Sequence, residues 1–145
     1  MILDKLAVFA DAQTTTTSVA STDIVDTLAA GDAYVGDWFV ARVDTAYTAG
    51  AGAPLTDFQL QTSTTEAFTA VITLAQSSGY LVASLTAGKI WAVRIPLGAK
   101  RYLRGYINHS NYNGATAFLS ACATDLFITK DLTNNIQKRY ALSTP

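Results

Sequence analysis

Residues 89–108 read KIWAVRIPLGAKRYLRGYIN, and the spacing of their apolar residues indicates the fold class. Apolar side chains recur at every second position of its first half, namely at Trp91, Val93 and Ile95. Residues 97–99 supply a glycine-containing turn, and the second half again spaces its inward candidates evenly, at Leu103 and Ile107. A period of two residues places alternate side chains on opposite faces of a strand. The stretch therefore predicts two short antiparallel strands joined by a turn.

The same pattern continues outward in both directions. Runs rich in Thr, Val, Ile, Tyr and Phe, separated by turn residues, predict strands at 6–10, 20–27, 38–47, 55–62, 70–76, 80–85, 89–96, 100–108 and 116–129. Further inward-facing residues are expected at Phe39, Ala41, Val43, Phe58, Leu60, Ile72 and Leu74. The inward phase shifts near Cys122, itself expected to be buried, and this shift predicts a β-bulge.

These strands predict an all-β fold, a single-domain β-sandwich or jelly roll of about eight to nine antiparallel strands. We expect the sandwich to occupy residues 1–129 and an extended C-terminal arm to occupy residues 130–145. Residues 49–54 are expected to form a loop. The order of the strands within the sheets is not predicted.

Composition excludes several classes of protein. The chain has 145 residues, of which half are apolar, 24 are Ala, 20 are Thr and 14% are charged, with a net charge of −1. This composition excludes a disordered chain, a strongly basic nucleic-acid binder and a charge-rich coiled coil. One Cys and one His exclude a disulfide scaffold and a multi-Cys or multi-His metal site. No signal peptide or membrane-spanning run is recognisable, so synthesis in the cytoplasm without export is expected.

Residues that could carry catalysis are scarce. The chain contains no nucleophile elbow, no phosphate-binding loop and no H-E-x-x-H motif. His109, the single histidine, lies in a polar stretch and is expected in a surface loop. Asp26, Asp32 and Asp37 lack the spacing of a calcium loop and are expected to be solvated turn acids. The protein is therefore not expected to be an enzyme, to hold a metal or cofactor, or to bind a small-molecule substrate.

The predicted strand 100–108 carries the candidate interaction surface. Its outward positions hold alternating basic and aromatic residues: Lys100, Tyr102, Arg104 and Tyr106. Tyr and Arg are the residue types most enriched at binding hot spots. Gly105, on the opposite face, would allow a close backbone approach. Such a row could pair with acids of the same chain, dock on a protein or stack on single-stranded nucleic acid. Nucleic acid is not expected to be a partner.

Several segments resemble a known family. They are residues 1–13, residues 58–63 with Phe68, LTAGK at 85–89 and PLGAKRYLR at 96–104. Together they resemble the small jelly-roll cement (decoration) proteins of tailed-phage capsids. The resemblance implies a structural virion protein on the outer surface of an HK97-type shell, where it bridges adjacent major capsid protein subunits. It also implies a homodimer or homotrimer, with no nucleic-acid or membrane partner.

The two ends of the chain are expected to act as arms that reach neighbouring subunits. The residues expected to contribute to that interface are Ile2, Leu3, Lys138, Arg139 and Tyr140. Two alternatives remain open from the sequence. One is a carbohydrate- or receptor-binding sandwich of a phage tail or spike, with Trp38, Trp91 or Tyr34 exposed to stack on a sugar. The other is a small hydrolase that uses a pair of Asp residues.

Overall fold

The computed structural model describes residues 8–14, 17–28, 34–51, 54–110 and 118–130. Within these ranges the chain forms ten strands and one short 3₁₀ helix, η2, at Val82–Ser84. The strands are β1 (Val8–Gln13), β2 (Val19–Ala20), β3 (Val25–Asp26), β4 (Trp38–Ala51), β5 (Leu55–Ser63), β6 (Ile72–Gln76), β7 (Tyr80–Leu81), β8 (Ile90–Arg94), β9 (Tyr102–Ser110) and β10 (Phe118–Thr129). In the described part of the chain, no helix is long and apolar enough to span a bilayer.

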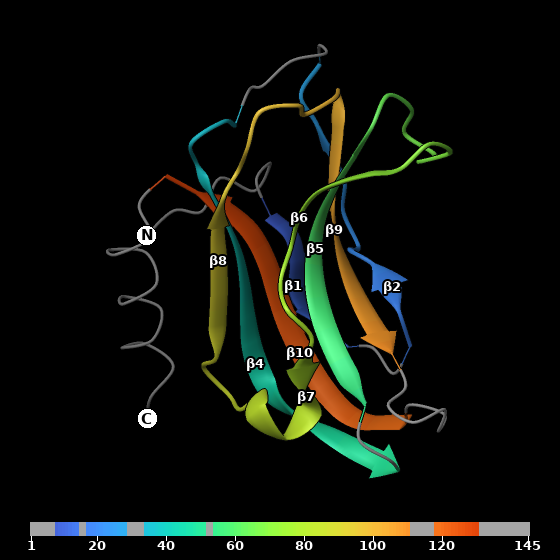
Figure 1. Ribbon diagram of the computed structural model, residues 1–145, viewed down its shortest axis with the longest axis vertical. Helices are drawn as coiled ribbons and strands as arrows, with labels where there is room; N and C mark the ends of the chain where they lie inside the picture. The colour runs from blue at the N-terminus through green and yellow to red at the C-terminus, as the bar shows by residue number, and fades with distance from the viewer. Residues whose placement is uncertain (1–7, 15–16, 29–33, 52–53, 111–117, 131–145) are drawn as a thin grey trace.

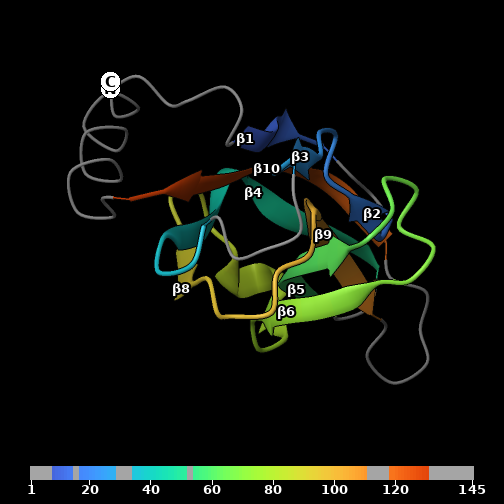
Figure 2. The same cartoon turned by 90° about the horizontal axis from the view of Figure 1, so that it is seen from above.

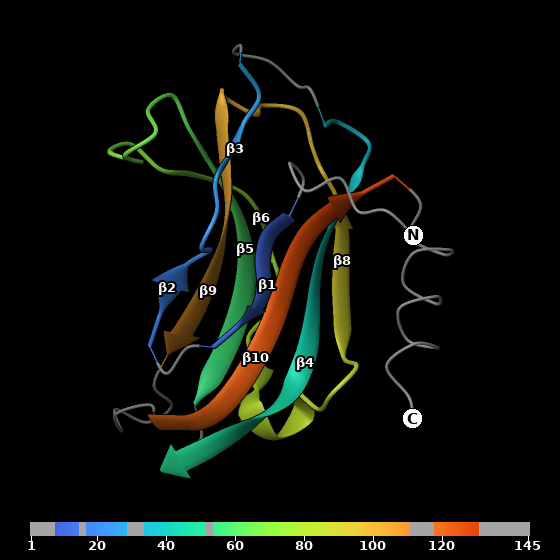
Figure 3. The same ribbon diagram turned by 180° about the vertical axis from the view of Figure 1, so that it is seen from behind.

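The strands form two sheets that pack face to face. One, the β4 sheet, has the order β1-β10-β4-β8; the other, the β9 sheet, has the order β2-β9-β5-β6, with β3 also paired to β9 and β7 to β5. Figure 1 shows β5 and β9 in front, and Figure 3 shows β10 and β4 on the opposite side of the molecule. Seen from above, the two sheets form two layers (Figure 2). The predicted all-β sandwich is confirmed.

The pairing has the nested order of a jelly roll. The first strand pairs with the last (β1 with β10), β2 and β3 pair with β9, β4 pairs with β8, and β5 pairs with β6, all antiparallel. The chain therefore folds like one long hairpin whose two arms wrap around each other. Two further pairings, β10 with β4 and β5 with β9, join the arms laterally into sheets.

The core lies between the sheets and is built by the period-two pattern. Its largest fully buried side chains include Phe9, Phe39, Phe58, Leu60, Leu103, Ile107 and Leu126. Phe39 packs edge-to-face on Phe9 and on Trp91, with ring centroids 5.7 and 5.9 Å apart. The predicted inward residues of β4, β5 and β9 are confirmed, and Cys122 is buried as expected. The predicted bulge also occurs, because the β10–β4 register shifts between Ala121 and Thr124.

Three predicted segments are wrong in detail. The strand expected over 20–27 is two short strands, because between them the backbone leaves β9 and Asp23 N–H donates to Phe9 O at 2.8 Å. The strand expected over 80–85 stops at Leu81, where η2 begins. The loop expected from residue 49 begins later, since β4 continues to Ala51 against β10.

One predicted core residue is also wrong. Ile72 is 48% exposed, whereas its expected partner Leu74 does pack against the core. The β5–β6 register shifts between Leu60 and Gln61, and β6 is the edge strand of its sheet. A bulge on an edge strand changes which side chains face inward, and a period-two pattern alone does not detect it.

Candidate protein-binding face

The outward row of β9 stands beside the outward row of β5. Tyr102 pairs with Ser63, Arg104 with Gln61, and Tyr106 with Gln59. We call the outer surface formed by Tyr102, Arg104, Tyr106 and Gln59 the β9 face; Gln61 and Ser63 belong to the same row but are buried beneath it. The three β9 side chains are half-buried, whereas Leu103, Gly105 and Ile107 between them are buried. The sequence prediction that Tyr102, Arg104 and Tyr106 share one face is confirmed.

Lys100 lies just before β9 and is tied to it through the backbone. Its N–H donates to Thr62 Oγ1 at 2.8 Å, and the same hydroxyl donates to Tyr102 O at 2.8 Å. Thr62 is fully buried, so this contact anchors the end of β5 to the start of β9. The other predicted interface residues, Ile2, Leu3, Lys138, Arg139 and Tyr140, lie outside the described residues.

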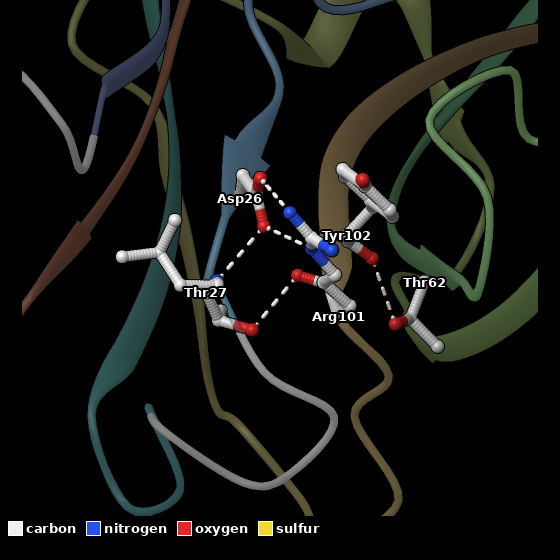
Figure 4. Close-up of polar contacts among 6 residues, drawn as sticks. Asp26, Thr27, Thr62, Arg101 and Tyr102 are labelled. Atoms are coloured by element: carbon white, nitrogen blue, oxygen red, sulfur yellow. Dashed lines mark hydrogen bonds and ion pairs between the residues drawn. The ribbon is translucent and has the colours of Figure 1, made fainter.

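An ion pair fixes the start of β9 to β3. Figure 4 shows Asp26 and Arg101 pointing toward each other, with Nε to Oδ1 at 2.8 Å and Nη2 to Oδ2 at 2.9 Å. The Arg101 hydrogen bond lowers the pKa of Asp26, and the same contact raises the pKa of Arg101. Thr27 Oγ1 donates to Arg101 O at 2.8 Å. The charge of Arg101 is therefore balanced within the chain.

Arg104 is held by two aromatic rings. Its guanidinium carbon lies 4.3 Å from the ring centroid of Phe68 and 5.7 Å from that of Tyr106. Its Nε–H donates to Gln61 Oε1 at 2.8 Å. Phe68 is 6% exposed and adopts φ +51°, a left-handed conformation that is strained for a bulky residue. The rings and Gln61 together fix the plane of the guanidinium.

A chain of hydrogen bonds runs from Arg104 to Asp57. Gln61 Nε2 donates to Gln59 Oε1 at 2.9 Å, and Gln59 Nε2 donates to Asp57 Oδ2 at 2.9 Å. Arginine can only donate and a carboxylate can only accept, so the orientation of both glutamine amides is determined. Gln76 and Asn108 also donate to Asp57, at 3.0 and 2.8 Å. Asp57 therefore joins β5, β6 and β9 on their outer side.

With Phe58 and Leu60 inward, the period of two in residues 55–62 predicts that Asp57, Gln59 and Gln61 face outward, but it does not reveal that they orient Arg104. Phe68 was noted only as part of a resemblance. The alternation of an acid with two amides was the available signal. It could not identify the partner strand, because the residues paired between β5 and β9 are 39 (Ser63 with Tyr102) to 55 (Leu55 with Ser110) positions apart in the chain.

The aromatic residues considered for sugar stacking are placed differently from that expectation. Trp91 packs against the core, and Tyr34 does so as well. The guanidinium carbon of Arg94 lies over Trp38, 4.6 Å from the centroid of its ring. The predicted inward phase of β8 is confirmed for Trp91, which packs on Phe39, so this ring is not free to stack on a sugar as the alternative would require.

A family model described as Bbp16 matches residues 9–128. The chain belongs to the Bbp16 family. The match runs from β1 to β10, so both sheets and the β9 face lie inside this Bbp16 domain. No curated protein matches the chain in sequence.

Two buried titratable groups of the Bbp16 domain lie away from Arg104. His109 belongs to β9, and the expected surface loop is wrong: its Nδ1 lies 2.9 Å from Thr56 Oγ1, and its Nε2 is buried without a partner in the described structure. Burial lowers the pKa of His109 to about 4. On β4 and β10, Arg42 bridges Asp44 and Asp125, the latter at 3.0 Å. Burial, reinforced by Asp44, raises the pKa of Asp125 to about 6.

These two groups have opposite effects on stability in acid. A histidine whose pKa falls from 6.5 to about 4 on folding stabilises the native state above pH 6.5 and loses that contribution as the pH falls toward 4. Asp125 binds its proton more tightly in the native state, so its contribution is present at low pH and is lost as the pH rises through about 6. The two slopes oppose each other between pH 4 and 6.

We therefore expect a His109→Gln variant to gain stability relative to wild type as the pH falls from 7 to 4. The relative gain should be about 1 to 2 kcal/mol, because partial exposure of the ring screens part of the effect. Urea unfolding at four pH values in this range measures it. An Asp125→Asn variant is the control and should show the opposite trend relative to wild type. Parallel pH profiles for wild type and His109→Gln would contradict the prediction.

Proposed function

We propose that this protein is a structural protein of a tailed-phage virion, a cement protein on the outer surface of an HK97-type capsid. It binds the major capsid protein and stabilises the shell by bridging adjacent subunits. Two findings from the sequence support the proposal. One is the resemblance of residues 85–89 and 96–104 to capsid cement proteins. The other is membership of Bbp16, a phage-associated family, over residues 9–128.

The observation that carries the proposal is the arrangement of the β9 face. Tyr102, Arg104 and Tyr106 stand in a row on a strand paired along its length, with Arg104 fixed by Phe68 and Gln61. Side chains that are ordered before binding lose less conformational entropy on association. Tyr and Arg in such a row are the composition of a protein-binding hot spot.

Binding alone is sufficient for this function. A protein seated across a junction between two subunits adds its binding free energy to that junction. A standard interface buries about 800 Å² on each partner and reaches nanomolar affinity when its hot spots are well placed. The proposal therefore requires no catalysis, cofactor or small-molecule substrate. On the shell, the protein is proposed to be a homodimer or a homotrimer.

Addition of the protein to shells of the major capsid protein from the same phage should raise the temperature at which the shells disassemble. At a concentration of about 100 times Kd, each occupied site gains about 2.7 kcal/mol. Light scattering during a thermal ramp, with and without the protein, measures the change. Equal disassembly temperatures would count against the proposal.

The β9 face supplies a matched pair of variants for the same assay. The double substitution Tyr102→Ser and Tyr106→Ser should remove most of the protection. Leu97→Ser is the control, because Leu97 is 74% exposed but lies in the β8–β9 loop rather than on the β9 face. If the double variant and Leu97→Ser gave equal disassembly temperatures, the tyrosines of the β9 face would not be the specific contact with the shell.

A further inference from the structure

We infer that Arg104 receives a carboxylate, and that the β9 face therefore docks on an acidic patch of its protein partner. The inference rests on the proposed function and deepens it, since it states the chemistry of the capsid surface that is bound. The hydrogen bonds of Arg104, the placement of the neighbouring charges and the strain at Phe68 support it.

The free donors of Arg104 point to an anion. Arginine has five N–H groups, and the single hydrogen bond that the described residues accept from Arg104 is Nε to Gln61. No atom of the described chain accepts a hydrogen bond from either Nη of Arg104. Neither Nη is among the buried atoms that lack a partner, so both remain accessible from outside. The Nη1–Nη2 edge can therefore receive both oxygens of one carboxylate end-on. Phe68 and Tyr106 already hold the guanidinium plane.

Arg104 has no counter-ion among the residues that the structure describes. In the described part of the chain, the ion pairs are Arg42 with Asp44 and Asp125, and Arg101 with Asp26. Arg104 and Lys100 take part in none of them. Asp57 is the acid linked to Arg104, but only through two glutamines, and amide donors from Gln59, Gln76 and Asn108 occupy it. Glu66 is close enough to Arg101 to raise its pKa through charge attraction, but it forms no ion pair with any described residue.

Arg104 is partly buried, so its charge is less well stabilised by water than that of a fully exposed arginine. Desolvation lowers the pKa of Arg104, so part of the water that would stabilise its charge is already excluded. A carboxylate that arrives from a partner would restore that stabilisation at a smaller desolvation cost than at a fully hydrated arginine.

The strain at Phe68 is the second independent observation. A phenylalanine at φ +51° is an outlier, and such outliers persist where the surrounding structure over-determines them. Here the conformation directs the ring beneath the guanidinium of Arg104. Phe68 is thus a positioning residue for Arg104. A protein carboxylate is favoured over a nucleic-acid phosphate because the chain has a net charge of −1.

The test measures binding of the full chain to shells of the major capsid protein from the same phage by co-sedimentation. Arg104→Gln should weaken binding roughly 100-fold. Arg104→Lys keeps the charge but loses the planar fork, and it should weaken binding about tenfold. Arg94→Gln is the matched control, because Arg94 also stacks on an aromatic ring, 4.6 Å from Trp38, but on the β4 sheet. It should bind like wild type, and thermal melts confirm that each variant is folded.

The outcomes separate this inference from the proposed function. If wild type binds the shells and Arg104→Gln binds equally well, the function stands and the carboxylate site is wrong. If wild type does not bind the shells at all, the proposed function and the inference both fail. If Arg104 instead governs binding to a single-stranded oligonucleotide, measured by fluorescence anisotropy, its ligand is a phosphate and the inference is overturned.

Discussion

Replacing Gly105 by alanine should lower the free energy of unfolding by about 2 kcal/mol, and replacing it by valine should lower it by about 3 kcal/mol or more. A Cβ at position 105 would lie 2.6 Å from Leu126 Cδ1 and 3.4 Å from Leu126 Cβ. Leu126 is fully buried on the opposing sheet and has little room to move. The glycine is required by this close approach of β9 to β10 rather than by its φ.

The backbone of Gly105 is also held in place from the side. Its carbonyl accepts a hydrogen bond from Ser21 N–H at 2.8 Å, and its N–H donates to Ser21 Oγ at 3.0 Å. The strand therefore cannot shift away from Leu126 without breaking both bonds. Chemical denaturation of wild type and the two variants measures the loss.

A control and a rescue make this prediction specific. Gly79→Ala should change stability by less than about 1 kcal/mol, because a Cβ there would make an ordinary contact of 3.6 Å with Leu55. In a Leu126→Ala background, Gly105→Ala should cost at least about 1 kcal/mol less than in wild type, since the clashing atoms are absent. Additive effects in this double-mutant cycle would show that Leu126 is not the cause.

Removal of the Asp57 carboxylate should produce the other large effect. We expect Asp57→Ala to lower the free energy of unfolding by about 3 kcal/mol, since hydrogen bonds to a charged group are stronger than ordinary ones and three of them are lost together. Asp57 is 6% exposed and accepts from three side-chain amides on three strands. Asp57→Asn, which replaces one acceptor oxygen by a donor, should cost about half as much.

Asp23→Ala is the matched control for the Asp57 variants. Asp23 is exposed, and its described contacts are made by its backbone, so the substitution should stay within about 0.5 kcal/mol of wild type. Urea unfolding of the three variants at pH 7 gives the comparison. If Asp57→Ala were no more destabilising than Asp23→Ala, the chain of hydrogen bonds from Arg104 to Asp57 would make no measurable contribution to the free energy of unfolding. A large loss accompanied by weaker shell binding would tie the chain to the orientation of Arg104.

Much of the fold follows from local sequence. The alternation in residues 38–47, 55–62 and 100–108 predicts which side chains enter the core, because a pleated strand has a period of two. The predictions fail where a long-range contact overrides that period. Residues 20–27 break into two strands where Asp23 bonds to Phe9, and His109 becomes part of β9 because Thr56 of β5 lies beside it.

That this chain is an all-β sandwich, and that Tyr102, Arg104 and Tyr106 share a face, could be predicted from the order of its residues. Both are properties of residues close together in the chain, and the two-residue period records them. Three contacts could be seen only in the folded chain: Arg104 lies on Phe68, Gln61 and Gln59 link Arg104 to Asp57, and Gly105 meets Leu126. Apart from the links within β5, these contacts join residues that are 21 (Gly105 to Leu126) to 43 (Gln61 to Arg104) positions apart in the chain. The jelly-roll pairing that brings them together has no local signal in the chain.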